Sequence, residues 1–321
     1  FFVSCKDKKQ YYEESGTVFH TLYTIKYEAP HILTDKIDAE LQKFNLSLNP
    51  FNPNSIIAKV NNNEAVEVDE WFTEVFNKSM EVSRNSDGVF DITCAPLVNL
   101  WGFGFNKKDS VTPAMIDSLK TFVGYRKVHL EGKKVVKDDP RLLLNCSAIA
   151  KGYSCDVIAR LLEKEGVENY MILIGGEVVV KGVNQNGVCW RTGINLPEDD
   201  PDGIKNNYDE IVQLCKKGAI ATSGNYRNFY IKDGKKYAHT IDPRTGYPAE
   251  QSVLSATIVA NDCMTADAYA TAFMAMGLEK ARQMADSLPE IEYYVIYADE
   301  NGKHQIEYSK GMLQYLPKRK Q

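Results

Sequence analysis

The chain has 321 residues, 44% hydrophobic and 25% charged, a composition that suits one large globular domain or two modest ones. The net charge is −5 and no long basic run occurs, so nucleic acid is not expected as a partner. The sequence also has no run of about eighteen apolar residues, the length that would predict a transmembrane helix.

The N-terminus reads FFVSC and is followed by a polar, charged stretch. Apolar residues just before Ser4 and Cys5 are typical of the end of a bacterial lipoprotein signal, in which Cys5 would be lipidated. The alternative is an arbitrary apolar start with a buried cysteine. We expect residues 1–14 to form a lipoprotein-type N-terminus and tether, attached to the membrane through a lipid anchor at Cys5.

The chain contains seven cysteines, and none of them forms a CxxC pair, which disfavours a zinc ribbon or a redox motif. Six cysteines remain besides Cys5, and each lies among apolar or small neighbours in the sequence. We interpret these six as small core residues. Disulfides remain an alternative in an exported protein, because the sequence alone cannot pair cysteines.

The hydrophobic pattern predicts elements in chain order. The first half reads as a β-rich run at 18–27, helices at 34–45 and 69–84 separated by a Pro- and Asn-rich loop at 47–55, a helix opening at 112–113, and a hairpin at 128–139. The second half reads as a helix at 150–164, a strand pair at 170–182, a surface loop at 199–208, strands at 218–222, 228–232, 236–241 and 253–260, a helix at 265–276, and a hairpin at 293–309. Strands and helices do not alternate regularly, so the predicted fold class is α+β.

The helix TADAYATAFMAMG carries the first candidate site. Asp267 and Thr271 are four residues apart and therefore share one helical face, among small or apolar neighbours. A carboxylate and a hydroxyl side by side are hard oxygen donors that suit magnesium. The alternative is that Asp267 only offsets the helix dipole and Thr271 is a core hydroxyl.

Two further candidates lie in the segment at 222–248. Ser223 and Gly224 could form a backbone nest whose amides point at a phosphate, or an ordinary turn. His239 ends a predicted strand just before an Asp-Pro turn, where a rigidly held imidazole suits a general base. A hydrogen-bonded loop histidine is the alternative.

Two more segments suit a bound nucleotide. Lys151 falls at the start of a helix, where a cation and free backbone amides both favour an anion. Gly175 and Gly176 interrupt a strand pair, which suggests close approach by a ligand or by another part of the backbone. An exposed lysine and simple packing are the corresponding alternatives.

Aromatic residues form the last group. Trp101 and Phe103, spaced by Gly102, could wall a flat aromatic ligand or fill a core corner. Phe51 lies between two prolines in the loop at 47–55, and a loop anchor is its simpler interpretation. The sequence has no Walker loop, GxGxxG fingerprint, HExxH helix or Gly-x-Ser-x-Gly elbow, which disfavours the common NTPase, dehydrogenase and hydrolase classes.

Taken together and in order, these segments resemble the ApbE family of FAD:protein FMN transferases. The segments that carry the resemblance are SGT (15–17), SIIAKVN (55–61), GVFDIT and PLVNLWGFG (88–104), SAIAKGYSCD (147–156), IGGEVVVKG (174–182), TSGNYRNF (222–229), HTIDPRTGYP (239–248) and TADAYATAFMAMG (265–277). The resemblance implies a mixed sheet of T-fold-like architecture with helices packed on it. It also implies one catalytic domain over residues 15–321, which could comprise two lobes with FAD between them.

The resemblance further implies a reaction, in which the hydroxyl of a Thr or Ser on an acceptor protein attacks FAD, FMN becomes esterified to it and AMP leaves. Mg2+ would lie on the pyrophosphate of FAD, held by Asp267, Thr271 and the carbonyl of Ala148. His239 matches the base that takes the hydroxyl proton. Lys151 matches a lysine that contacts FAD.

Other positions are assigned by the same resemblance. Ile241, or Thr240 beside it, would lie against the nucleotide, and Phe51 would cover the flavin or the adenine. Where the family commonly has Met-Gly-Thr, this chain has Ser15 at the first position, so a different FAD contact is expected there. Asn145 stands where the family commonly has Asp, and it can hydrogen-bond the adenine or ribose without carrying a charge.

The expected partners are therefore FAD and acceptor proteins such as subunits of membrane redox pumps or flavin-carrying electron-transfer domains. The expected location is the periplasmic face of the bacterial inner membrane. Two alternatives remain open, an FAD pyrophosphatase that gives FMN and AMP, and a flavin-binding lipoprotein that stores or delivers FAD.

Overall fold

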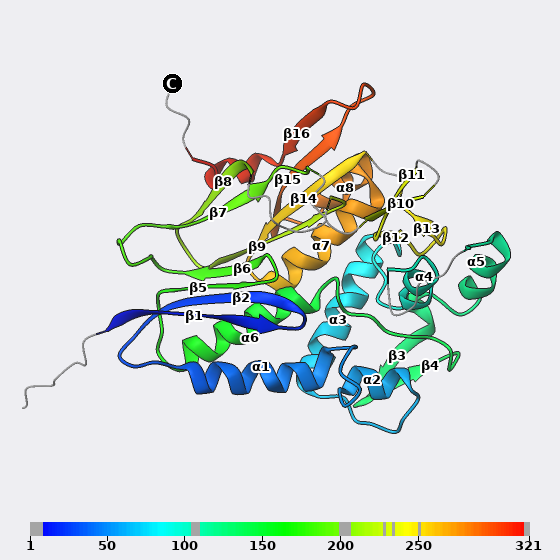
Figure 1. The fold of residues 1–321 in the computed structure, drawn as a ribbon, viewed down its shortest axis with the longest axis horizontal. Coiled ribbons are helices and arrows are strands. Elements are labelled where there is room, and N and C mark those ends of the chain that lie inside the picture. Colours follow the sequence, from blue (N-terminus) through cyan, green and yellow to red (C-terminus); the bar gives the residue numbers. More distant parts are fainter. Residues whose placement is uncertain are drawn as a thin grey trace, which may run out of the picture.

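One large antiparallel sheet organises the fold (Figure 1). The computed structural model describes residues 9–103, 110–198, 207–226, 229–232, 235–249 and 252–317. Across the sheet the strand order is β1 (Gln10–Val18), β2 (Thr21–Ala29), β5 (Tyr170–Ile174), β6 (Glu177–Lys181), β9 (Gly218–Gly224), β14 (Val253–Ala260), β15 (Ile291–Ala298) and β16 (His304–Tyr308). Each neighbouring pair runs antiparallel.

Helices pack along one face of this sheet (Figure 1). They include α1 (Thr34–Leu48), α6 (Ala150–Lys164) and α7 (Cys263–Met276). The other described helices are α2 (Ile56–Asn61), α3 (Glu70–Asn85), α4 (Ala95–Leu100), α5 (Pro113–Lys120) and α8 (Leu278–Ala285), with short 3-10 turns at Tyr125–Lys127 and Lys310–Gln314.

Local sequence explains where several helices begin. Asp69 caps α3, and its carboxylate accepts a hydrogen bond of 2.8 Å from the backbone N–H of Phe72. Thr112 caps α5 through a bond of 3.3 Å from the N–H of Met115, and Pro113 occupies the first helical position, where its missing N–H costs nothing.

The central strands are buried on both faces. On the helical face, Ile172 and Val179 pack against residues of α1 and α6 such as Ile158. On the other face, Val178 and Ile220 pack under a hairpin formed by β7 (Trp190–Asn195) and β8 (Tyr208–Leu214). Two-sided burial explains why these strands read as continuous apolar runs and not as alternating ones.

Smaller elements build a satellite core beside the sheet (Figure 1). The short strand pairs are β3 (Val128–Glu131) with β4 (Lys134–Lys137), β10 (Phe229–Lys232) with β11 (Lys235–Ala238), and β12 (Ile241–Asp242) with β13 (Tyr247–Pro248). Leu97, Leu100, Ile116 and Ile241 form the buried centre of this second cluster, between α4, α5 and β12.

The α+β class is confirmed, and the predicted helix at 150–164 matches α6 at both ends. The large sheet differs from the mixed sheet that the resemblance implied, because all of its strand pairs are antiparallel. The tether was predicted too long, because residues 10–14 belong to β1. Tyr208 was assigned to a loop but begins β8, while residues 199–206 of that loop, and Cys5, lie outside the described residues.

The interpretation of six core cysteines was wrong for two of them. Cys189 and Cys215 form a disulfide that links the residue before β7 to the residue after β8. The four other described cysteines are free, and three of these are buried. Within the ranges that the structure describes, none of the helices has the length and apolar character that a membrane span requires.

Candidate active site

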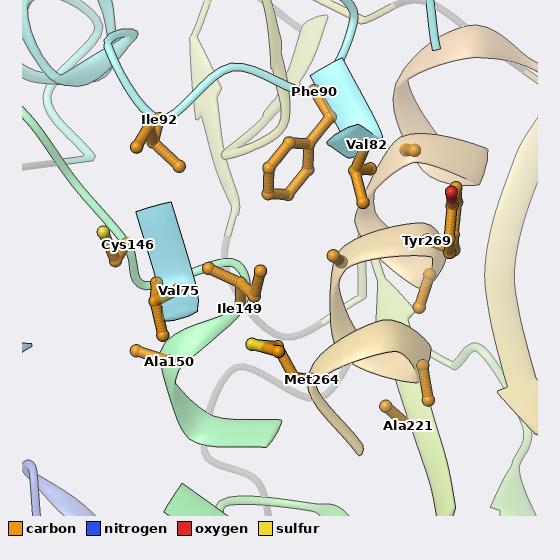
Figure 2. Packing of buried hydrophobic residues seen from close by; sticks show 14 of the residues in the cluster. Val75, Val82, Phe90, Ile92, Cys146, Ile149, Ala150, Ala221, Met264 and Tyr269 are labelled. Atoms are coloured by element: carbon orange, nitrogen blue, oxygen red, sulfur yellow. The ribbon is translucent and has the colours of Figure 1, made fainter. Parts of the chain in front are cut away.

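Helix α7 carries the centre of the site and packs against β9 and β14 of the sheet and against the neighbouring helix α6. Thirteen of its 14 residues are buried, and Thr271 is the exception. Figure 2 shows Met264, near the start of α7, beside Ile149, the residue that directly precedes α6. A helix buried on nearly all sides holds its polar side chains at fixed positions.

Close contact between α6 and α7 depends on Gly152. A Cβ atom at this position would lie 2.2 Å from the carbonyl oxygen of Cys263 and 2.7 Å from Cβ of Asp267. Such distances are far inside van der Waals contact, so only glycine fits here. The absent side chain lets the first turn of α6 reach the carboxylate of Asp267.

Two carboxylates cap the start of α7. Asp262 accepts a hydrogen bond of 2.8 Å from the N–H of Thr265, which is the usual capping arrangement. Asp156 belongs to α6 and accepts bonds of 2.9 and 2.8 Å from the N–H groups of Cys263 and Met264. The cap by Asp156 joins the two helices, and so fixes the position of Asp267 along the axis of α6.

Asp267 is 3% exposed and accepts a hydrogen bond of 2.9 Å from the N–H of Gly152. Burial raises the pKa of Asp267, while the Lys151 ammonium and that N–H act in the opposite direction. Lys151 forms an ion pair with Glu177, the first residue of β6. Burial would lower the pKa of Lys151, but Glu177 and Asp267 outweigh it and raise that pKa, so the lysine is charged.

Thr271 lies one helical turn beyond Asp267, as the spacing predicted. Its hydroxyl is 3.2 Å from the hydroxyl of Ser223, on β9. The predicted nest at Ser223 and Gly224 was wrong, because both residues are in a regular strand that pairs with β14. Ser223 contributes its hydroxyl to the site. At Gly224 an added Cβ would lie 2.2 Å from Cε1 of Tyr226, so that ring would have to move.

Ala148 lies in the turn that leads into α6. The N–H of Ala150 donates a bond of 2.8 Å to the carbonyl of Cys146 and closes this turn. The side-chain oxygen of Asn145 accepts a bond of 2.8 Å from the N–H of Ser147. In this structure Asn145 therefore shapes the turn that carries Ala148.

His239 directly follows β11 and stands at the end of a series of aromatic rings. Its ring meets that of Phe103 edge-on, with 6.4 Å between centroids. Phe103 stacks on Tyr230 at 5.1 Å, and Tyr230 stacks on Tyr237 at 5.2 Å. Tyr237 in turn stacks on Trp101 at 5.7 Å. The stacked rings support one side of the imidazole.

Trp101 anchors this series to the turn between β12 and β13. It is 8% exposed, and its indole N–H donates a bond of 2.8 Å to the carbonyl of Gly246. Gly102 follows with φ of 82°, which turns the chain away from α4. Ile241 is 6% exposed and packs in the satellite core. Trp101 and Ile241 therefore serve as core residues here, whereas Phe103 contacts His239.

The paired glycines lie in the turn between β5 and β6. The N–H of Gly175 donates a bond of 2.9 Å to the carbonyl of Leu22, and a Cβ there would lie 3.0 Å from Cδ of Lys151. The groups that an added Cβ at Gly175 would meet are side chains, Lys151 first among them, and not the ligand or backbone that the prediction named. At Gly176 a Cβ would meet nothing within 4 Å, although its φ of 109° still favours glycine.

Phe51 and Ser15 lie apart from the contacts described so far. Phe51 is 53% exposed, and its ring meets His20 edge-on at the tip of the β1–β2 hairpin. The hydroxyl of Ser15 is 3.2 Å from that of Thr24, on the neighbouring strand of the same hairpin.

The oxygen donors fit a hard cation. Among the described residues, no group of three or more His, Cys, Asp and Glu side chains could hold a metal ion. By the family resemblance, a cation here would combine the Asp267 carboxylate with the Thr271 hydroxyl and the backbone carbonyl of Ala148. Mg2+ takes few protein ligands and completes its shell with water and substrate phosphate, so this donor set suits it.

A family model decides the identity. The model of the ApbE family matches residues 19–295, which is most of the chain. The chain belongs to the ApbE family. Curated relatives named FAD:protein FMN transferase include that of Vibrio cholerae, 36% identical over 88% of this chain and 86% of the relative, and that of Escherichia coli K12, 33% identical over 78% and 73%. As a member of this family, the chain is an enzyme of the transferase class.

Solved structures of ApbE proteins share the fold. The flavin transferase ApbE from Vibrio cholerae superposes with a TM-score of 0.86 at 33% identity, covering 96% of this chain and all of that one. The apo flavinyl transferase ApbE from Pseudomonas stutzeri gives 0.84 at 26% identity, with 96% and 97% covered. The family fold therefore extends over nearly the whole chain.

Four residues that contribute to this ApbE site were missed in the sequence. Glu177 and Asp156 come from segments far from their partners, and only the strand pair and the helix crossing bring them together. Tyr230 and Tyr237 face each other across the β10–β11 pair, and one tyrosine on each of two predicted neighbouring strands was a signal that could have found them.

Proposed function

We propose that this enzyme transfers FMN from FAD to a Thr or Ser hydroxyl of an acceptor protein, with Mg2+ present, and releases AMP. Family membership supports flavin transfer, and the relatives' name gives both FAD and a protein acceptor. The observation that carries the rest is the pair on α7, where a buried Asp267 lies one turn before Thr271, the only half-buried residue of that helix.

Each part of the site has a role in the proposed reaction. Mg2+ held by Asp267, Thr271 and the Ala148 carbonyl would neutralise charge on the pyrophosphate of FAD. Lys151 adds a fixed positive charge beside that position, at the start of a helix, where an anion is favoured. Both effects stabilise the charge that leaves with AMP.

His239 is the proposed base. The acceptor oxygen forms a bond to the FMN phosphorus while the bond from that phosphorus to the oxygen of AMP breaks, and the hydroxyl proton passes to the imidazole. The ring is half-buried and supported by Phe103. A base held in this way needs little reorientation when the acceptor arrives.

The test combines FAD, MgCl2 and a candidate acceptor polypeptide with the full chain, and measures AMP and protein-bound FMN. Transfer predicts equal amounts of both products, formed only with the acceptor. Free FMN and AMP without an acceptor would instead indicate a pyrophosphatase, and tight FAD binding without AMP a flavin-binding lipoprotein.

Variants assign the roles separately. Asp267→Ala is expected to abolish AMP release, whereas Asp117→Ala, on the exposed face of α5, is expected to leave it unchanged. His239→Ala is expected to lower transfer by about 100-fold or more, and the exposed His304→Ala serves as its control. AMP release that survives in Asp267→Ala would show that the metal assignment is wrong.

We also propose a location and partners. The FFVSC start supports a lipid anchor at Cys5 and the periplasmic face of the inner membrane, where a disulfide such as Cys189–Cys215 persists. By family resemblance, the acceptors are subunits of membrane redox pumps or flavin-carrying electron-transfer domains. Cys5→Ser should move the protein from the membrane to the soluble fraction, and a protein that remains membrane-bound would contradict the anchor.

A further inference from the structure

Glu177 has a buried carboxylate, and only one of its two oxygens has a hydrogen-bond partner among the described residues. The side chain is 4% exposed, and Oε1 accepts a hydrogen bond from the ammonium of Lys151. The second oxygen, Oε2, is buried and has no hydrogen-bond partner among the residues that the structure describes. A buried carboxylate with an unsatisfied oxygen is costly, so its position calls for a reason other than stability.

The backbone is built to bring this carboxylate to Lys151. Gly175 and Gly176 precede it with φ of 67° and 109°, so the turn takes a path that favours glycine at both positions. A Cβ at Gly175 would lie 3.0 Å from Cδ of Lys151 and 3.2 Å from Oε2 of Glu177. At Gly175 the turn therefore leaves no room for a side chain beside the ion pair.

Lys151 has two carboxylates within electrostatic reach. Both Glu177 and Asp267 raise its pKa, so its ammonium is attracted to each of them. In the structure the ammonium pairs with Glu177, while Asp267 accepts a bond from the N–H of Gly152. A lysine side chain is long and flexible, so without Glu177 its charge would turn to the remaining carboxylate.

We propose that Glu177 is a positioning residue that holds the Lys151 ammonium away from Asp267, and so keeps Asp267 available to a divalent cation. The inference rests on the proposed function, because the cation at Asp267 is part of it. With an uncharged side chain at position 177, Lys151 pairs with Asp267 and competes with the metal. Substitution of residues that orient a metal ligand, without binding the metal themselves, typically lowers metal affinity by about 10- to 100-fold.

The test measures Mn2+ binding to the full chain without FAD, from the electron paramagnetic resonance signal of free Mn2+. Glu177→Gln is expected to weaken binding by about tenfold or more. In the Lys151→Met background the same substitution is expected to change binding by less than about threefold, because no ammonium remains to be held. Thermal unfolding checks that each variant is folded.

Two results would overturn the inference. One is Mn2+ affinity in Glu177→Gln within about twofold of wild type. The other is an equal loss in both backgrounds, which would mean that Glu177 acts only as an additional negative charge. If Glu177→Gln does not fold, Glu177→Asp replaces it in the same comparison. This variant keeps the negative charge on a side chain one methylene shorter, so Mn2+ affinity is expected to fall by about threefold.

Asp267→Asn separates the inference from the proposed function. Loss of Mn2+ binding in Asp267→Asn together with an unaffected Glu177→Gln refutes the role of Glu177 alone. Unchanged binding in Asp267→Asn refutes the metal site itself.

Discussion

Adding a single methyl group at Gly152 is expected to disturb the site without replacing any of its polar side chains. In Gly152→Ala the new Cβ would lie 2.2 Å from the carbonyl oxygen of Cys263, about 1.2 Å closer than ordinary contact allows. The opposing atom belongs to the backbone of α7 and cannot rotate away. Helices α6 and α7 must therefore separate.

The size of the effect follows from two opposing contributions. Overpacking of this kind costs about 3 kcal/mol, the upper end of the usual range, because a backbone atom blocks the new group. Alanine is a better helix former than glycine by about 1 kcal/mol, which offsets part of the cost. The net loss of about 2 kcal/mol corresponds to a fall in melting temperature of about 3 °C for a chain of this length.

Calorimetry and Mn2+ titration together test this expectation. The separation of the helices also removes the N–H of Gly152 from Asp267, so Mn2+ should bind more weakly in Gly152→Ala. Gly218→Ala is the matched control, because a Cβ there would lie 3.6 Å from Cδ2 of Leu214 and 3.9 Å from the carbonyl oxygen of Ala260. A Gly152→Ala protein that melts and binds Mn2+ like wild type would refute the close-packing argument.

Three further predictions concern stability. Burial raises the pKa of Asp156 to about 7, above its unfolded value. The contribution of Asp156 to the free energy of unfolding should therefore fall as pH rises from about 4 to 7. In urea titrations, the stability difference between wild type and Asp156→Asn should shrink over that range. Trp101→Phe leaves the Gly246 carbonyl without its donor and should cost about 1–3 kcal/mol by chemical denaturation, with no loss if that bond is unimportant. Replacing both Cys189 and Cys215 by serine opens a link across 26 positions and should cost about 3 kcal/mol while AMP release at 25 °C is retained, so inactive folded protein would contradict it.

Local patterns predicted the elements that carry the site. The apolar spacing of 150–164 and the small-residue run before Gly277 defined α6 and α7, because helices are specified by their own periodicity. Asp267 and Thr271 were placed on one face for the same reason. Lys151 was placed at a helix start, and the structure shows in addition that it forms an ion pair with Glu177.

Features that depend on long-range pairing could not be predicted in this way. Glu177 reaches Lys151 only because β6 lies beneath α6, and nothing in the spacing of 26 residues between them indicates contact. The disulfide between Cys189 and Cys215 depends in the same way on the β7–β8 register. The direction of neighbouring strands in the large sheet likewise depends on chain connections that a hydrophobic pattern does not encode.

The burial of α7 has a consequence for how members of this family can diverge. A helix with 13 of 14 residues buried, packed against β9, β14, α3 and α6, cannot accept a larger side chain without a change in the neighbour that this side chain meets. The exposed loop around Phe51 carries no such constraint. Surface segments of this kind can therefore change between family members more freely than α7, which is inherited together with the fold.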